Sequence, residues 1–221
     1  MAVNIQRYKE ISQDLAAQKV SLVAVSKIKS VSDILELYNE GQRDFGENYV
    51  QELIEKHGLL PKDIRWHFIG HLQTNKVKYI APFIHLIHGV DSEKLVKEIN
   101  KQSIKNNRTI NCLLQVYIAQ EETKFGFDQD ELDDFFKNKI GQYSQTNFLG
   151  LMGMASFSED MNQVKNEFQK LKNIFDQYAL SASLPQPLSI LSMGMSADYK
   201  IAIAAGSNMV RIGSLLFGAR N

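Results

Sequence analysis

Short runs of hydrophobic residues alternate with amphipathic stretches along the whole chain. Eight runs of strand length are each followed by a segment with hydrophobic residues at helical spacing or by a short turn, and one more amphipathic segment precedes them. The predicted strands cover 21–25, 43–46, 66–69, 84–88, 110–118, 147–152, 188–191 and 209–212. The predicted helices cover 4–18, 32–40, 48–57, 74–80, 93–106, 129–138, 159–179 and 196–205, and a final turn covers 214–220.

This order of elements predicts an α/β protein with a single (β/α)8 barrel and an extra N-terminal helix. The strands are almost continuously hydrophobic, as parallel strands covered on both faces should be. An open, doubly wound sheet is the alternative architecture. No linker rich in Gly, Ser or Pro divides the chain, so we expect residues 1–221 to form one domain.

Composition and charge exclude several classes of protein. The chain has 221 residues, of which 44% are hydrophobic, which excludes disorder. Cys112 is the only cysteine, so a disulfide-stabilised secreted scaffold is excluded. Lys and Arg number 25, as do Asp and Glu, so no basic excess favours nucleic acid. Without an N-terminal apolar signal or an 18-residue apolar run, we expect a cytoplasmic monomer with no membrane partner.

In a barrel of this type, functional residues lie at the carboxyl ends of the strands. Lys27 directly follows the first predicted strand. A lysine partly removed from water has a lowered pKa and can form a Schiff base with an aldehyde. The alternative is a lysine that simply extends into solvent.

Two turns rich in glycine and serine follow the last two strands, at the position where barrels often bind phosphate. Gly194-Met195-Ser196 and Gly213-Ser214 are each predicted to open a helix, whose first N–H groups attract anions. Ordinary helix caps are the alternative. Arg211 lies within the last strand, where an arginine needs either a carboxylate from a neighbouring strand or a ligand atom.

Other common sites are not supported by the sequence. No GxGxxG or GxxxxGK[ST] motif is present, so neither dinucleotide nor nucleoside triphosphate binding is indicated. His67 and His71 are four residues apart at a strand end, without a third ligand at a recognised spacing. We therefore predict no metal site.

The motifs taken together resemble the pyridoxal phosphate homeostasis protein family, the YggS/PROSC group. The matching segments are 22–27, 45–48, 66–73, 150–155, 191–198 and 210–214. They follow one another over nearly the whole chain. The resemblance implies a fold-type III barrel similar to the barrel domain of alanine racemase. The sequence departs from the family pattern at Tyr117 and Phe125, in and after the fifth strand.

The resemblance also implies a binding site for pyridoxal 5'-phosphate (PLP). Lys27 would hold PLP as a Schiff base, and the two glycine-serine turns would bind its phosphate. Arg211 would face the pyridine nitrogen, and Asn48 would lie near the ring. The implied cofactor-binding residues are Lys27, Asn48, Met195, Ser196, Arg211, Gly213 and Ser214.

Three functions are compatible with such a site. The first is a PLP-binding protein that buffers PLP or delivers it to apo PLP-dependent enzymes, and so supports vitamin B6 and amino-acid homeostasis. The second is a PLP-dependent amino-acid racemase with weak activity, and the third is a phosphate-sugar isomerase or aldolase. Racemases of this fold use a tyrosine from a C-terminal domain, and this chain ends at Asn221, soon after the eighth strand. An arginine at the pyridine nitrogen also makes the ring a poor electron sink. We therefore expect the first function and no enzymatic turnover.

Overall fold

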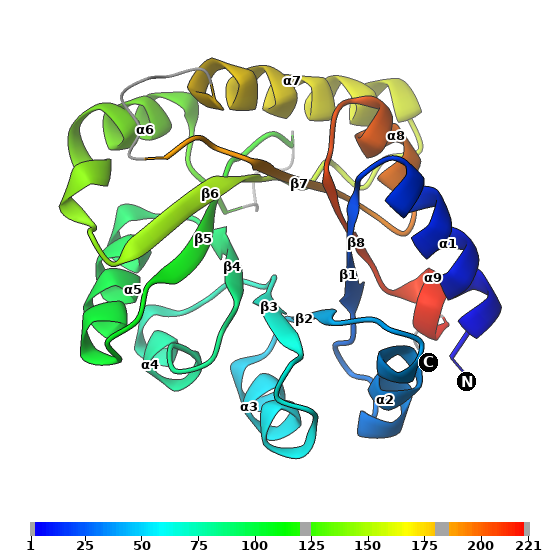
Figure 1. The fold of residues 1–221 in the computed structure, drawn as a ribbon. Coiled ribbons are helices and arrows are strands. Elements are labelled where there is room, and N and C mark those ends of the chain that lie inside the picture. The colour runs from blue at the N-terminus through cyan, green and yellow to red at the C-terminus, as the bar shows by residue number, and fades with distance from the viewer. Residues whose placement is uncertain (1–2, 120–124, 180–185, 219–221) are drawn as a thin grey trace.

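Eight parallel strands close into a barrel in the computed structural model, which describes residues 3–119, 125–179 and 186–218 (Figure 1). The strands pair in chain order, and β8 pairs with β1 in the register Leu22 to Val210. This closure confirms the predicted barrel and rules out the open sheet. The strands are β1 (Ser21–Val25), β2 (Asp44–Glu47), β3 (Arg65–Phe68), β4 (Leu86–Val90), β5 (Ile110–Gln115), β6 (Thr146–Met152), β7 (Ile190–Met195) and β8 (Met209–Ile212).

The helices surround the ring of strands (Figure 1). They are α1 (Ile5–Ala17), α2 (Val31–Asn39), α3 (Val50–Leu59), α4 (Val77–Ile80), α5 (Glu93–Lys105), α6 (Gln129–Asp134), α7 (Met161–Ala179), α8 (Tyr199–Ala204) and α9 (Ser214–Phe217). The extra N-terminal helix is α1, as predicted. It lies beside α9, where the Asn4 amide donates to the Leu216 carbonyl at 2.8 Å. This bond fixes the last described helix near the start of the chain.

Hydrophobic side chains on both faces of the strands explain their nearly continuous apolar sequences. The larger core lies between the strands and the helices, and it includes Cys112, whose buried thiol has a raised pKa. A smaller cluster fills part of the barrel interior and consists of Val23, Leu86, Leu113, Met152 and Met209. The rest of the interior holds buried polar side chains, among them Arg211, His88 and Ser192.

Several element boundaries differ from the sequence predictions. β4 begins two residues later than expected, and β7 begins at Ile190 and continues to Met195, because Ser192 is buried inside the barrel despite its polarity. Helix α8 begins at Tyr199 and not at residue 196, after the N-cap residue Asp198. The predicted helix 129–138 divides into α6 and the π-helical turn Phe135–Lys139. Residues 219 and 220 of the predicted final turn lie outside the described residues.

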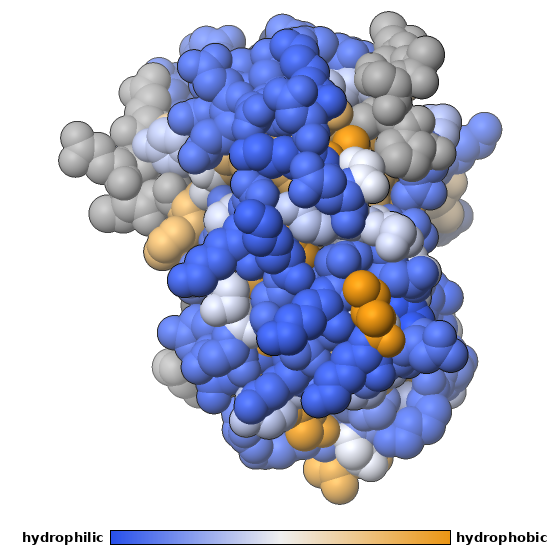
Figure 2. Space-filling view, turned by 90° about the vertical axis from the view of Figure 1, so that its left-hand side faces the viewer, coloured by the Kyte–Doolittle hydropathy of each residue, from blue (hydrophilic) through white to orange (hydrophobic). Residues whose placement is uncertain are grey.

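The surface on the side of α5 and α6 is mostly hydrophilic, and the hydrophobic residues exposed there are separated from one another (Figure 2). In the part of the chain that the structure describes, no helix combines the length and the hydrophobicity that crossing a membrane requires.

Candidate functional site

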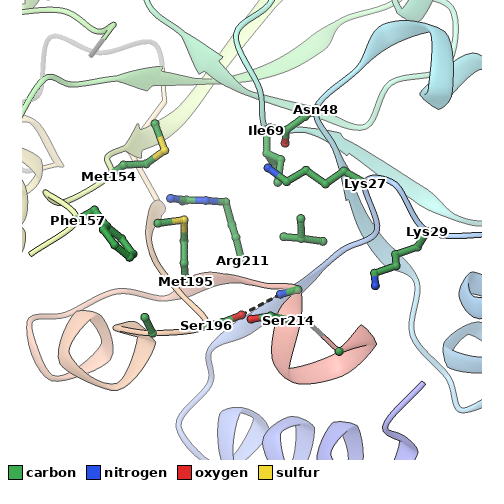
Figure 3. Close-up of a pocket in the computed structure, with 14 residues that line it drawn as sticks. Lys27, Lys29, Asn48, Ile69, Met154, Phe157, Met195, Ser196, Arg211 and Ser214 are labelled. Carbon is green, nitrogen blue, oxygen red and sulfur yellow. Dashed lines mark hydrogen bonds between the residues drawn. The ribbon is translucent and has the colours of Figure 1, made fainter. Parts of the chain in front are cut away.

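A cavity of about 330 Å³ opens at the carboxyl ends of the strands, chiefly β1, β2, β7 and β8 (Figure 3). This is the end of a barrel at which parallel strands present functional side chains. All seven residues predicted from the sequence line this one cavity: Lys27, Asn48, Met195, Ser196, Arg211, Gly213 and Ser214. The fold therefore brings together residues that are separated by up to 187 positions in the sequence.

Lys27 extends from the end of β1 into the cavity, toward Asn48 and Ile69 (Figure 3). The backbone on both sides of Lys27 is held by two side chains of α3. The carbonyl of Ser26 accepts a hydrogen bond from Lys56 Nζ at 2.7 Å. The amide of Ile28 donates to Glu52 Oε1 at 2.6 Å, and Ile28 has a left-handed φ of 62°, which is costly for a β-branched residue. These bonds hold the strained turn that directs Lys27 into the cavity.

The same side chains form a buried ion-pair network beneath Lys27. Lys56 Nζ lies 2.8 Å from Glu47 and 2.6 Å from Glu52, and the Ser26 hydroxyl donates to Glu47 at 2.6 Å. Glu47 is fully buried and Lys56 is 5% exposed. Burial raises the pKa of Glu47, and the positive charge of Lys56 opposes that rise. The network is the structural support of the segment that carries Lys27.

The turn after β7 is shaped by Gly194, which has a φ of 95°. A Cβ atom at this position would lie 2.6 Å from the Cβ of Ala202, so the turn and its packing on α8 both require glycine. Ser196 does not open a helix, contrary to the sequence prediction, because α8 begins three residues later. Its hydroxyl instead accepts a hydrogen bond from the Gly213 amide at 3.2 Å and so joins the turns after β7 and β8 (Figure 3).

Hydrogen-bond donors gather where these two turns meet. Within the described part of the chain, the amides of Ser196 and Ser214 make no hydrogen bond, and neither does the Ser214 hydroxyl. The Met195 amide is engaged, since it donates to Asp198 Oδ1 at 2.6 Å. A group of N–H and O–H donors without protein acceptors is the chemistry that binds a phosphate.

Arg211 crosses the barrel interior and is 3% exposed. Its guanidinium donates to the Ser192 carbonyl at 2.9 Å, to the Ser192 hydroxyl at 2.7 Å and to the Gly153 carbonyl at 3.0 Å. Among the described residues no carboxylate forms an ion pair with it, so the structural alternative considered from the sequence is not found. Burial lowers the pKa of Arg211 to about 10, which leaves the side chain protonated at neutral pH.

A column of hydrogen-bonded side chains continues below Arg211 through the barrel interior. His88 Nδ1 lies 3.1 Å from the Ser192 hydroxyl, His88 Nε2 lies 2.9 Å from His67 Nδ1, and His67 Nε2 lies 3.0 Å from Asp44 Oδ1. His67 is thus buried within the barrel interior and does not lie at the end of its strand with His71. Burial lowers the pKa of His88 well below its usual value, so its imidazole is neutral. Each contact has one donor and one acceptor when the protons run from Arg211 toward Asp44. His88 then carries its proton on Nε2, and His67 donates from Nε2 to Asp44.

The structure adds cavity residues that sequence reasoning missed. Lys29 lines the cavity, and its Nζ donates to the Phe217 carbonyl at 2.9 Å. Its spacing of two residues from Lys27 could have indicated this. Met154 and Phe157 enter from the segment after β6 (Figure 3). Phe125 stacks on His71 instead of lining this cavity.

The closed parallel barrel, with a lysine after β1 and donor-rich turns after β7 and β8, is similar to the barrel of the alanine racemase class. Residues 2–221 match the family described as "Alanine racemase, N-terminal domain". The chain is 40% identical over 200 residues to the pyridoxal phosphate homeostasis protein of Aquifex aeolicus, covering 90% of this chain and 86% of that protein. It is 38% identical over 219 residues to the Homo sapiens protein of the same name, covering 95% and 80%. The chain therefore belongs to the pyridoxal phosphate homeostasis protein family, as the motifs predicted.

Solved structures agree with this assignment. PipY of Synechococcus elongatus, solved with PLP bound, superposes with a TM-score of 0.87 at 32% identity, covering 96% of this chain and 99% of that one. Alanine racemase from Bartonella henselae, with covalently bound pyridoxal phosphate, gives a TM-score of 0.69 at 16% identity and covers 97% of this chain but 59% of that one. The second likeness concerns the fold alone.

Proposed function

We propose that this protein binds PLP in the cavity at the barrel mouth and buffers it or delivers it to apo PLP-dependent enzymes. It thereby supports vitamin B6 and amino-acid homeostasis and has no catalytic turnover of its own. The observation that carries the proposal is the convergence of Lys27, Arg211 and a set of donors without protein acceptors in a single cavity. The names of the relatives and the PLP-bound PipY structure support it.

The residues present fit this cofactor at each of its polar groups. The amine of Lys27 would take the aldehyde, and the amides and hydroxyls of Ser196 and Ser214 would bind the phosphate. Arg211 would donate to the pyridine nitrogen. Asn48 Oδ1 is buried without a hydrogen-bond partner among the described residues, so it offers an acceptor to a ligand. When bound, PLP supplies an electrophilic aldehyde and a ring that can accept electrons.

The chemistry of the cavity favours a carrier over a racemase. A protonated Arg211 would donate a hydrogen bond to the ring nitrogen of bound PLP, which would keep that nitrogen unprotonated and make the ring a weak electron acceptor. Racemisation also needs a second acid/base on the opposite face of the substrate. Within the described lining there is no Tyr, His, Asp or Glu. His67, His71 and Tyr117 are the nearest candidates in or just after the strands, and none of them lines the cavity.

The recipients are proposed to be apo PLP-dependent enzymes as a class, and residues 1–221 are proposed to act as one domain. Monomeric state and cytoplasmic location stay predictions from the sequence.

An absorbance spectrum of the purified protein before and after borohydride tests the proposal. We expect a yellow protein whose cofactor is trapped on Lys27, and a Lys27→Ala variant in which trapping is lost. Lys29→Ala is the matched control, because Lys29 lines the same cavity but holds the Phe217 carbonyl. Trapping at natural stoichiometry in Lys27→Ala would show that the assignment is wrong. Racemase turnover approaching about 1 per second would exclude the carrier function.

A further inference from the structure

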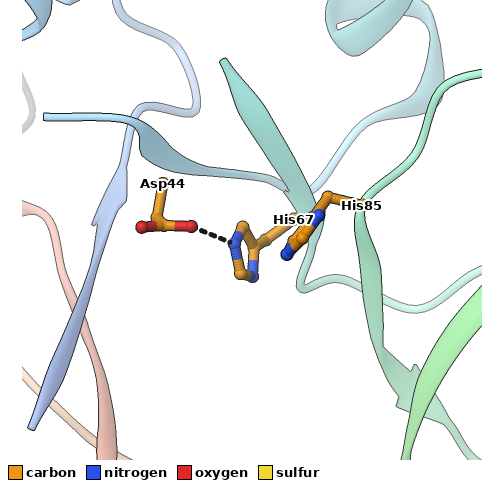
Figure 4. Close-up of side chains that lie close together, drawn as sticks. All are labelled: Asp44, His67 and His85. Atoms are coloured by element: carbon orange, nitrogen blue, oxygen red, sulfur yellow. Dashed lines mark hydrogen bonds and ion pairs between the residues drawn. The ribbon is translucent and has the colours of Figure 1, made fainter. Parts of the chain in front are cut away.

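Three potential metal ligands meet near the amino-terminal end of the barrel, away from the cavity (Figure 4). Asp44 is the first residue of β2, His67 lies in β3 and His85 immediately precedes β4. Their ligand atoms all lie within 4.8 Å of one another, and Asp44 Oδ1 is 3.0 Å from His67 Nε2. None of the three lines the PLP cavity. This juxtaposition has no part in the proposed function.

We propose that Asp44, His67 and His85 bind one divalent transition-metal ion of the zinc type, with water as the fourth ligand. Two imidazoles and one carboxylate form a donor set that Zn²⁺ takes with an open fourth position. Ligand atoms in a tetrahedral shell with bonds of about 2.1 Å lie roughly 3.4 Å apart. The present ligand atoms lie within 4.8 Å of one another, so each pair differs from that value by at most about 1.4 Å, a change that side-chain rotation can supply.

The surroundings of His67 provide the outer support that metal-binding histidines usually have. With Nε2 on the metal, the proton of His67 moves to Nδ1, which donates to His88 Nε2 at 2.9 Å. The donors of the column then reverse between these residues, and His88 Nδ1 donates to the Ser192 hydroxyl. His88 is fully buried and is held in turn by Ser192 at 3.1 Å. The ring of His67 is therefore already oriented toward the site.

His85 provides the entry path. It is partly exposed, and its imidazole makes no hydrogen bond in the described ranges, although its ring lies 5.3 Å from that of His67. A metal ion can reach the cluster from solvent past this side chain. His85 can also be replaced without removing a hydrogen bond from the fold.

Arg65 competes for the carboxylate of this site. Its guanidinium binds both oxygens of Asp44, with Nε at 2.7 Å, and the Arg65 side chain is 49% exposed. A metal ion must displace this group, which can swing into water. Arg65 therefore lowers the affinity of the site, and its removal should strengthen metal binding while removal of a ligand weakens it.

A metal ion here would join β2, β3 and β4 at the end of the barrel where residues serve stability. Binding to the folded chain alone would raise the melting temperature with the concentration of metal. We therefore infer a structural site and not a catalytic one.

Titration of the full-length protein with Zn²⁺ alone, followed by calorimetry and thermal melting, tests this proposal. We expect one Zn²⁺ per chain, and at least about 100-fold weaker binding in His85→Ala, since even outer partners of a metal ligand contribute 10–100-fold. Arg65→Gln should bind more tightly than the natural protein. His71→Gln is the matched control, because His71 and Asp91 form a two-ligand pair 2.8 Å apart elsewhere in the barrel.

Zn²⁺ affinity should fall in His85→Ala and rise in Arg65→Gln, and these opposite changes distinguish this site from unspecific binding. His85→Ala without metal should melt as the natural protein does, which shows that its loss of binding is not a loss of folding. The proposal is overturned if His85→Ala binds Zn²⁺ as tightly as the natural protein, or if Arg65→Gln binds no more tightly. Absence of saturable binding to the natural protein below about 100 μM would overturn it as well.

Discussion

Replacing Lys56 by Met should destabilise the fold strongly, because it leaves Glu47 buried without its cation. The Lys56 ammonium bonds to Glu47 at 2.8 Å, to Glu52 at 2.6 Å and to the Ser26 carbonyl at 2.7 Å. Breaking one partner of a buried pair costs about 3–5 kcal/mol. Glu47 can avoid being a buried, unpaired charge by taking up a proton. At pH 7 this costs about 3.4 kcal/mol for a carboxyl with an ordinary pKa of 4.5.

This protonation of Glu47 determines how the stability of Lys56→Met depends on pH. In Lys56→Met the pKa of Glu47 in the folded state rises further above its unfolded value, so the folded state binds the extra proton. Stability is retained at low pH and lost as the pH rises. At pH 5 protonation costs only about 0.7 kcal/mol. We expect a loss of about 3 kcal/mol at pH 7 and about 1 kcal/mol at pH 5.

Urea unfolding at both pH values measures this loss. The double variant Lys56→Met with Glu47→Gln is the control, because it removes the charge that the single variant leaves buried, and it should recover part of the stability. A loss below about 1 kcal/mol at pH 7, or an equal loss at the two pH values, would refute the reasoning.

Two further predictions concern the cavity and the core. Ser214→Asp places a negative charge beside the donors of the two turns, so PLP affinity measured by titration should fall by about 1–3 kcal/mol. Ser214→Ala should lose less affinity. Equal affinity in the Asp variant would contradict the phosphate position. Cys112 should not react with a thiol reagent at pH 8 until the protein unfolds, because burial raises the pKa of its thiol, and rapid reaction of the folded protein would contradict its place in the core.

The barrel was predictable from the sequence because its signal is local and repeated. Each strand is a short hydrophobic run and each main helix an amphipathic one, so small errors in boundaries do not change the topology. The predicted boundary of β7 was wrong because a polar residue lies inside the barrel there. Ser192 interrupts the hydrophobic pattern of β7 because it faces buried Arg211 and His88.

Lys27, Ser196, Gly213 and Ser214 were predictable because they follow strands directly, and the fold places the ends of parallel strands together. Arg211 was indicated by its charge within a strand, and Asn48 came only from the family resemblance.

The polar column below Arg211 and the cluster of Asp44, His67 and His85 could not be predicted. Their members come from different strands, and only the register between paired strands brings them into contact. His67 lies beside Asp44 because β2 and β3 pair with each other. The number of residues between positions 44 and 67 does not show this pairing. The support of Lys27 by Lys56 was missed for the same reason.

The absence of acidic residues from the described cavity lining has a kinetic consequence. Lys27, Lys29 and Arg211 place three cationic side chains around one opening, while the chain as a whole carries 25 acidic and 25 basic residues. In a molecule without net charge, a cleft lined by cations attracts a small anion toward that cleft. Salt screens this attraction over about 8 Å at physiological ionic strength. We therefore expect capture of a phosphorylated ligand to be faster than the net charge suggests, and to slow as salt is added.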